Sequence, residues 1–552
     1  MFYNYIMSSV SDHVQLMKSQ ENKYDSVFNK REWLYINDTT TQYDQGTSII
    51  ETTSLSSNSK FLDYNSAYLS VPLLVTLTSN ASAITGIADT DTLPYTKSVG
   101  FKQSFLSMVN SITVDLNGQP MVQQNQLIDM YNHFRLLTSE SWNTQNRWST
   151  IGFYPDVAES AGFSTADSKY APAGQPANND TLNLGLYERL GYILDDAGET
   201  FSSVAGSALS NLISKTEMAK LYISHVSNLT AGTADVKSPV VQYSVKATIM
   251  LKDLHPLFEV MPISKSLNFK IQIFWNNSVV TATHDGTDWS AQSSQYRAYN
   301  GTLPLMLNNF TDGFAGSTAG TLRASVYVGD TCHDSTQKTV TNNGLSTGGV
   351  GKQVELWVPA YQMLPDVEMS YAQNHLRDIS YFDYYQFSLK NIGSGESFNH
   401  LVSNGISNLK AVLIVPLLHS LNNNVNAFDD GLPQLMGHIN NFNVLVGGSN
   451  VLHQDSRYTY QQFNNEFFHE FGVNGNQSSG LGSSLIDFKS WLKKPYYYVN
   501  CSRVPMEQQK AYRSLQIKGT NSSSLAMDYV IFALYEKNFK LDVISGNIEK
   551  LD

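Results

Sequence analysis

One pattern constrains the fold of this chain more than any other: a hairpin pattern that occurs twice, at Val109–Gln124 and again at Ile439–Gln454. In both copies apolar and polar residues alternate, which is typical of a strand with one buried face. The strand then reaches Asn117-Gly118 in the first copy and Gly447-Gly448 in the second. Such dipeptides readily adopt the positive φ angles that a two-residue hairpin turn requires. The sequence therefore predicts two equivalent hairpins.

Two further similarities keep the same order. The tetrapeptide Val-Pro-Leu-Leu occurs at 71–74 and at 415–418, each time in an apolar strand upstream of the hairpin. A helical pattern follows each hairpin, formed by Leu127, Met130, Tyr131, Phe134 and Leu137 in the first copy and by Tyr460, Phe463, Phe467 and Phe471 in the second. One such similarity arises easily by chance in a long chain, but three in one order indicate a duplicated unit.

The composition fits a large globular protein with extensive protein contacts. A chain of 552 residues is long enough for two or three domains. Only 15% of the residues are charged, and a surface rich in Tyr and poor in Lys is typical of contacts between protein copies. The net charge of −12 argues against nucleic-acid binding; Lys493-Lys494 is the nearest approach to a basic patch, and we interpret it as a solvated edge.

Features of secreted and membrane proteins are weak. Cys332 and Cys501 are too few for a disulfide framework, which favours a reducing compartment and two unpaired thiols. Asn-X-Ser/Thr sequons, among them Asn37 and Asn521, are attributed to composition. The N-terminus lacks a secretory pattern, and no apolar run approaches the ~20 residues that a bilayer requires.

The chain is predicted to divide into an arm and two similar halves. Residues 1–34 form the arm, in which Ile6, Val10, Val14 and Met17 fall on one side of a short helix. This helix packs on its own domain or docks a neighbouring subunit, a minor protein or a membrane surface. Residues 35–377 form the first domain and residues 378–552 the second.

Two segments of the first half, 139–217 and 276–351, are rich in small and polar residues and weakly periodic. They are predicted to be loop insertions outside the barrel cores. The tail at 543–552 shows helical spacing. Each half then has about eight strands and long loops, which fits a jelly roll better than an immunoglobulin-like sandwich. The predicted fold class is all-β: two tandem eight-stranded jelly rolls with long loop insertions and a few short helices.

Three segments carry a family resemblance. They are Ile249–Trp275, with the sequence IMLKDLHPLFEVMPISKSLNFKIQIFW, Val354–Leu389, and DYVIFALYEKNFKLDVISG at 528–546. In this order the chain resembles the double jelly-roll major capsid proteins of icosahedral double-stranded DNA viruses, and is most similar to those of the polinton-like virus and virophage group. The resemblance covers nearly the whole chain, and the long 276–351 insertion departs from the compact members.

The resemblance implies a structural role without a reaction. It implies homotrimeric, pseudo-hexameric capsomers that tile an icosahedral shell around a double-stranded DNA genome. The implied partners are further copies of the chain, a single jelly-roll penton protein at the vertices, and minor capsid proteins that meet the N-terminal arm. The implied location is the virion, with assembly inside the host cell and no passage through the endoplasmic reticulum. A contact with an internal membrane stays open.

Catalytic and metal-binding patterns are weak. Cys332-His333-Asp334 contains the residue types of a catalytic triad, but triads draw their members from distant segments. Glu466, His469 and Glu470 have helical spacing that suits a metal, and equally suits the charged face of an aromatic helix. We predict no catalytic residue, metal or cofactor. The alternatives are a host-attachment or glycan-binding β-sandwich protein and a secreted glycoside hydrolase.

Overall fold

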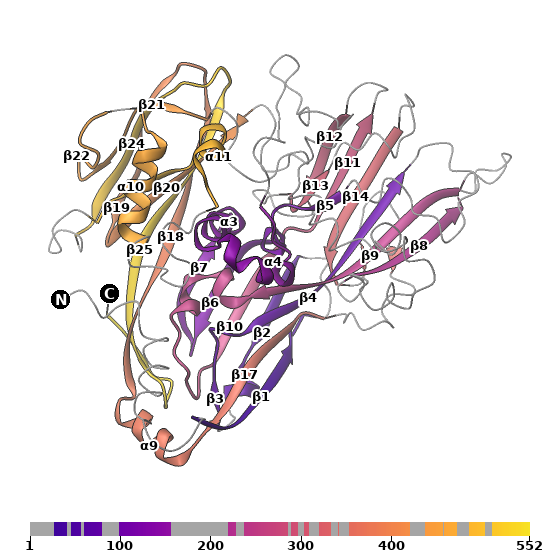
Figure 1. The fold of residues 1–552 in the computed structure, drawn as a ribbon, viewed down its shortest axis with the longest axis vertical. Helices are drawn as coiled ribbons and strands as arrows, with labels where there is room; N and C mark the ends of the chain where they lie inside the picture. Colours follow the sequence, from indigo (N-terminus) through magenta and orange to yellow (C-terminus); the bar gives the residue numbers. More distant parts are fainter. Residues whose placement is uncertain are drawn as a thin grey trace.

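The architecture is seen in the computed structural model of the chain (Figure 1). The structure describes residues 27–40, 46–56, 60–79, 99–155, 219–227, 237–284, 289–295, 303–307, 320–329, 331–332, 340–341, 353–419, 437–455, 457–471, 485–502 and 511–551. Within these residues β-strands predominate, and the helices are short.

Two antiparallel sheets form a first barrel. In one sheet the strand order is β1 (Phe28–Asn37), β17 (Glu355–Met363), β4 (Tyr68–Ser79) and β9 (Lys237–Met250). In the other the order is β2 (Thr47–Glu51), β10 (Phe269–Trp275), β6 (Val109–Leu116) and β7 (Gln119–Asn125). The alternating sequence of β10 buries Phe269, Ile271 and Ile273, while Lys270 is exposed. Period-two patterning thus fixes which face of the sheet enters the core.

The second barrel repeats this arrangement. One sheet has the order β18 (Leu376–Ile392), β25 (Met527–Asp542), β20 (Leu409–Leu418) and β23 (Tyr497–Asn500). The other has the order β19 (Ser397–Ile406), β24 (Arg513–Asn521), β21 (Ile439–Val446) and β22 (Ser449–Asn450). Numbered along the chain within each barrel, the first sheet joins strands one, eight, three and six, and the second joins strands two, seven, four and five. Both barrels follow this one scheme.

The predicted duplication is confirmed at its three markers. The turns between β6 and β7 and between β21 and β22 occupy the same place in their barrels, and Gly118 and Gly448 adopt φ angles of 77° and 81°. The two Val-Pro-Leu-Leu segments lie in β4 and β20, the third strand of each barrel. The two helical patterns form α3 (Ile128–Ser139) and α10 (Tyr460–Phe471), each following its hairpin.

The prediction that 276–351 is a loop insertion is wrong for the described part of that segment. It contains β11 (Ser278–His284), β12 (Trp289–Gln295), β13 (Leu305–Leu307), β14 (Gly320–Val328), β15 (Thr331–Cys332) and β16 (Val340–Thr341). β14 pairs with β4, and β11 pairs with β14, so this segment extends the first sheet. Its Val, Thr and Tyr residues suit a pleated surface despite the polar composition, and Tyr327 and Val279 pack on Leu74.

Three other expectations need correction. Residues 28–34 belong to β1 and pair with β17, so they are not part of an arm; residues 1–26 lie outside the described residues. The start of the 139–217 segment forms η3 (Trp142–Thr144) and α4 (Gln145–Ile151), where Trp148 is fully buried; residues 156–217 lie outside the described residues. The C-terminal tail forms β26 (Ile548–Lys550) rather than a helix, because its backbone pairs with residues 539–541 of β25.

One continuous hydrophobic core runs through both barrels. α3 lies between them, and the long β18–β25 ribbon descends from the second barrel along the side of the first to α9 (Pro365–Gln373) (Figure 1). Short elements complete the fold: α2 (Thr53–Ser56), β3 (Phe61–Leu62), β5 (Val99–Phe101), η2 (Phe105–Met108), β8 (Ala219–Ser227), α7 (Leu251–Leu254), α8 (Pro256–Glu259) and α11 (Phe488–Lys493). The domain division at residues 377 and 378 remains a proposal.

The hairpin turn gives a first test. We expect Gly118→Ala to lower the free energy of unfolding by about 1–2 kcal/mol, because a Cβ is strained at positive φ, although no atom lies within 4 Å of the added carbon. Gly405→Ala is the matched control, since Gly405 has no positive φ and only an ordinary contact at 3.8 Å. Urea denaturation measures both variants, and equal stabilities would contradict the assigned turn.

Candidate functional site

The feature that joins the two barrels is α3. Apolar and polar residues alike are buried around this helix, since it has a barrel on each side. Toward its own barrel, the Asn132 side-chain amide donates to the Leu254 carbonyl oxygen at 2.8 Å. Toward the second barrel, it presents Tyr131 and Phe134. We call the contact between the two barrels the seam. The first barrel contributes Tyr131, Phe134 and His255 to it, and the second contributes Asp383, Tyr384, Phe532 and Lys537.

Aromatic rings fill the part of the seam where α3 meets the second barrel. Phe134 lies between α10 and β23, with ring centroids 5.5 Å from Phe467 and 5.1 Å from Tyr496. Tyr131 contacts Tyr384 at 4.9 Å and Phe532 at 6.0 Å. Rings at these separations add stabilisation beyond the area they bury. The two barrels therefore share a packed core rather than a flexible junction.

Hydrogen bonds fix the register of the seam. The hydroxyl groups of Tyr381 and Tyr384 donate to the carbonyl oxygens of Met121 and Gln126, at 2.8 and 3.1 Å. The Lys537 ammonium group donates to the same Met121 carbonyl at 2.9 Å. These carbonyls belong to β7 and the turn after it, so the end of that hairpin strand is held by the second barrel.

A buried charge cluster lies in the seam. The Asp383 carboxylate, 1% exposed, lies 2.7 Å from the Lys537 ammonium and 3.6 Å from Nε2 of the fully buried His255. The Tyr535 hydroxyl also donates to Asp383, at 3.3 Å. Burial alone would raise the pKa of Asp383, but the hydrogen bond from His255 and the charge of Lys537 outweigh it and hold that pKa well below its usual range.

The geometry around His255 requires a neutral ring. His255 is the N-cap of α8, and its Nδ1 accepts from the Leu257 amide at 3.1 Å. Nδ1 therefore carries no proton, which leaves the proton on Nε2 to face Asp383. Burial lowers the pKa of His255, and the adjacent Asp383 carboxylate only partly offsets that effect.

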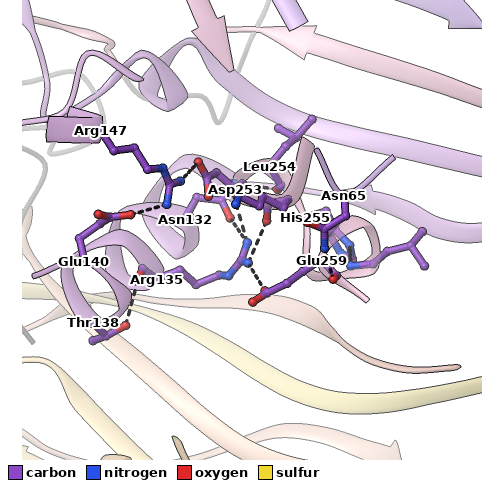
Figure 2. A network of polar contacts seen from close by, with 12 residues as sticks. Asn65, Asn132, Arg135, Thr138, Glu140, Arg147, Asp253, Leu254, His255 and Glu259 are labelled. Atoms are coloured by element: carbon purple, nitrogen blue, oxygen red, sulfur yellow. Dashed lines mark hydrogen bonds and ion pairs between the residues drawn. The ribbon is translucent and has the colours of Figure 1, made fainter. Parts of the chain in front are cut away.

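An arginine network fixes α3 to the segment that carries His255 (Figure 2). Arg147 bridges Glu140, at 2.7 Å, and Asp253. Arg135 donates to the carbonyl oxygens of Lys252 and Asp253 at 3.0 and 3.2 Å. Because both guanidinium groups reach across to the α7–α8 segment, the position of His255 is tied to α3.

The polar side chains of the seam hold the two barrels together. Asp383, His255 and Lys537 are residue types found in active sites, but here each is engaged by another group of the seam. Among the described residues, no group of three His, Cys, Asp or Glu side chains could hold a metal ion. No helix in the described part of the chain is both long enough and apolar enough to span a bilayer.

The catalytic and metal-binding candidates from the sequence have different places in the structure. Cys332 ends β15, while His333 and Asp334 lie outside the described residues. Glu466 is buried, and its carboxylate accepts from the Asn500 amide at 3.0 Å, so it serves the packing of α10 on β23. His469 and Glu470 lie in α10, but their side chains are outside the described set.

Two further sequence features have structural explanations. Asn521, a sequon residue, is fully buried, and its side-chain amide donates to the carbonyls of Ile392, Gly393 and Leu525. Cys501 is 2% exposed, with its sulfur 3.6 Å from the Val499 carbonyl oxygen. The prediction of two unpaired thiols is not tested, because the side chain of Cys332 lies outside the described residues.

Sequence reasoning missed the seam. His255 lies within the Ile249–Trp275 segment, which was singled out for its resemblance and not for chemistry. Asp383 stands in β18 with aromatic residues on both sides, and an acid flanked in this way is the signal that could have indicated a buried ion pair. Its partners come from distant parts of the chain, and no spacing rule connects them.

Solved structures resemble this chain over nearly its whole length. A chain of the Sputnik virophage, determined by cryo-electron microscopy, is 14% identical with a TM-score of 0.51, covering 96% of this chain and 91% of that one. The mavirus major capsid protein is 10% identical with a TM-score of 0.48, covering 96% and 92%. The PBCV-1 virus capsid structure gives 8% and 0.42, covering 97% and 99%. No family model and no curated protein matches the sequence.

The chain is a double jelly roll. The fold class predicted from the sequence is confirmed, since the strand order of both barrels and the likeness to the Sputnik chain agree. At this level of identity the likeness shows the fold alone.

The buried carboxylate of the seam gives a second test. We expect Asp383→Asn to lower the free energy of unfolding by about 1–3 kcal/mol, because the partly buried Lys537 ammonium loses its counter-charge and its charge-assisted hydrogen bond. Asp378→Asn, on the exposed face of the same strand, is the control and should change little. Equal losses of unfolding free energy in the two variants, measured by chemical denaturation, would show that the Asp383 ion pair does not stabilise the seam.

The pH dependence of stability gives a third test. The folded-state pKa values of His255 and Asp383 both lie below those of an unfolded chain, about 6.5 and 3.9. As the pH is lowered, the unfolded chain takes up these protons first. The free energy of unfolding should therefore decrease once the pH is below about 6.5, and decrease further once it is below about 4.

A substitution isolates the histidine. His255→Asn retains a side-chain oxygen that can cap α8, and it should flatten the loss of stability between about pH 6.5 and 4.5. His400→Asn, at an exposed position of β19, is the control. A profile identical in all three proteins would show that His255 does not titrate on unfolding.

Proposed function

We propose that this protein is a major capsid protein whose work is assembly. The observation that carries the proposal is the double jelly roll itself: two barrels of one topology, joined into a single block by a buried seam. The likeness to the Sputnik virophage chain over 96% of the sequence supports the same reading, as does the resemblance carried by the Ile249–Trp275 segment.

The mechanism is geometric. Three copies that close with threefold symmetry present six similar barrels and hence a nearly hexagonal outline. Such homotrimers can tile a flat lattice, and permanent subunit contacts of this kind bury on the order of 2,000 Å² or more. The shell that they form is icosahedral and encloses a double-stranded DNA genome.

The proposal extends to partners and location. A flat lattice needs a different protein at its fivefold vertices, and a single jelly-roll penton protein fits that role. Residues 1–26, which precede β1, are the candidate segment for contact with minor capsid proteins. The protein is placed in the virion after assembly inside the host cell, without passage through the endoplasmic reticulum.

The mass of the purified protein tests this function. Native mass spectrometry should give about three times 61.5 kDa, and negative-stain images should show six-sided particles, because threefold closure of two-barrel subunits produces that outline. A chain that stays monomeric, even with its vertex protein present, would contradict the proposed function.

A further inference from the structure

A patch of aromatic side chains lies on the outer side of the first barrel, on one of its two sheets. It consists of Trp33 and Tyr35 on β1, Trp357 on β17 and Tyr68 on β4, and we call it the aromatic face. The ring of Trp357 stacks on Tyr35 at 4.9 Å and on Tyr68 at 6.3 Å, and Trp33 lies 5.5 Å from Tyr68. Even so, Trp33 is 42% exposed and Tyr35 56%. Contiguous rings left open in this way are typical of an interaction site.

The equivalent surface of the second barrel is already covered. Its β18–β25–β20–β23 sheet has the strand order of the β1–β17–β4–β9 sheet. There the outward rings of Tyr384, Phe532 and Tyr498 contact Tyr131 and Phe134 of α3. α3, which follows the hairpin of the first barrel, therefore covers the aromatic outer side of this sheet of the second barrel.

The helix that corresponds to α3 in the second barrel is α10. Its inner side packs on β23 through Glu466 and Phe467, whereas Gln461 and Asn465 are exposed. The neighbouring α11 adds Phe488, 56% exposed, which lies 5.7 Å from Tyr460 of α10. Unlike α3, this helical surface has its outer side open.

We propose that a second copy of this chain covers the aromatic face with its α10–α11 surface, repeating between copies the contact that α3 makes within the chain. The proposal rests on the proposed function and names the surfaces through which that assembly closes. Because the two surfaces differ, the contact is head-to-tail, and such a contact builds a ring when its rotation closes. Aromatic residues at the centre of an interface carry much of its binding energy.

Removal of the aromatic face tests the proposal. In the full chain, the double variant Trp33→Ser and Tyr35→Ser should give a mass near 61.5 kDa where the wild type gives about three times that mass. Tyr512→Ser is the control, since Tyr512 is 79% exposed but belongs to neither surface, and it should keep the wild-type mass. Thermal melting of each variant checks that the fold is retained.

The outcomes separate the two proposals. A double variant that keeps the mass of the wild-type assembly overturns the inference about the aromatic face and leaves the proposed function standing. A wild-type chain that itself stays at 61.5 kDa overturns both. Loss of assembly in the double variant alone supports both.

Cross-linking provides a second readout that does not depend on weakening the contact. Chains with Tyr35→Cys and chains with Gln461→Cys, each in a Cys332→Ser background, are co-expressed and treated with a bis-maleimide reagent. A cross-linked pair should form only when both chains are present. Tyr35→Cys with Leu401→Cys is the control, because β19 lies at the opposite edge of its sheet from β22, the strand that leads to α10. Equal cross-linking in the control pair would overturn the assignment of the partner surface.

Discussion

The burial of α3 between two barrels is the constraint on which the rest of the structure depends. A helix that is apolar on more than one side cannot rest on a single sheet without exposing a face. Tyr131 and Phe134 would be left in water if the second barrel were absent, and Tyr384 and Phe532 would lose their cover. The duplication therefore yields one body, and the hydrophobic core passes through it without interruption.

We infer that the buried charges of the seam act on the specificity of the contact more than on its net stability. Bringing Asp383 out of water is costly, and Lys537, Tyr535 and a neutral His255 offset that cost only in one arrangement of the barrels. The hydroxyl groups of Tyr381 and Tyr384, which donate to carbonyl oxygens of β7 and of the turn after it, also fix how the two barrels align. A fixed angle between barrels is what the proposed role in a tiled shell requires.

The sequence was sufficient for features set by local periodicity. The hairpins at Gly118 and Gly448, the helices α3 and α10 and the all-β duplication follow from alternation, turn chemistry and helical spacing. The 276–351 segment was misread, because polar β-branched residues form an extension of a sheet as readily as a loop. The seam was missed since its members meet only through tertiary packing, as His255 and Asp383 do.

Differential scanning calorimetry of the purified protein tests the central claim that the seam makes one body of the two jelly rolls. A shared core should unfold in a single cooperative transition, with the calorimetric enthalpy equal to the van't Hoff enthalpy per cooperative unit. Two resolved transitions, one for each barrel, would show that α3 and the charge cluster do not couple them, and would contradict the account.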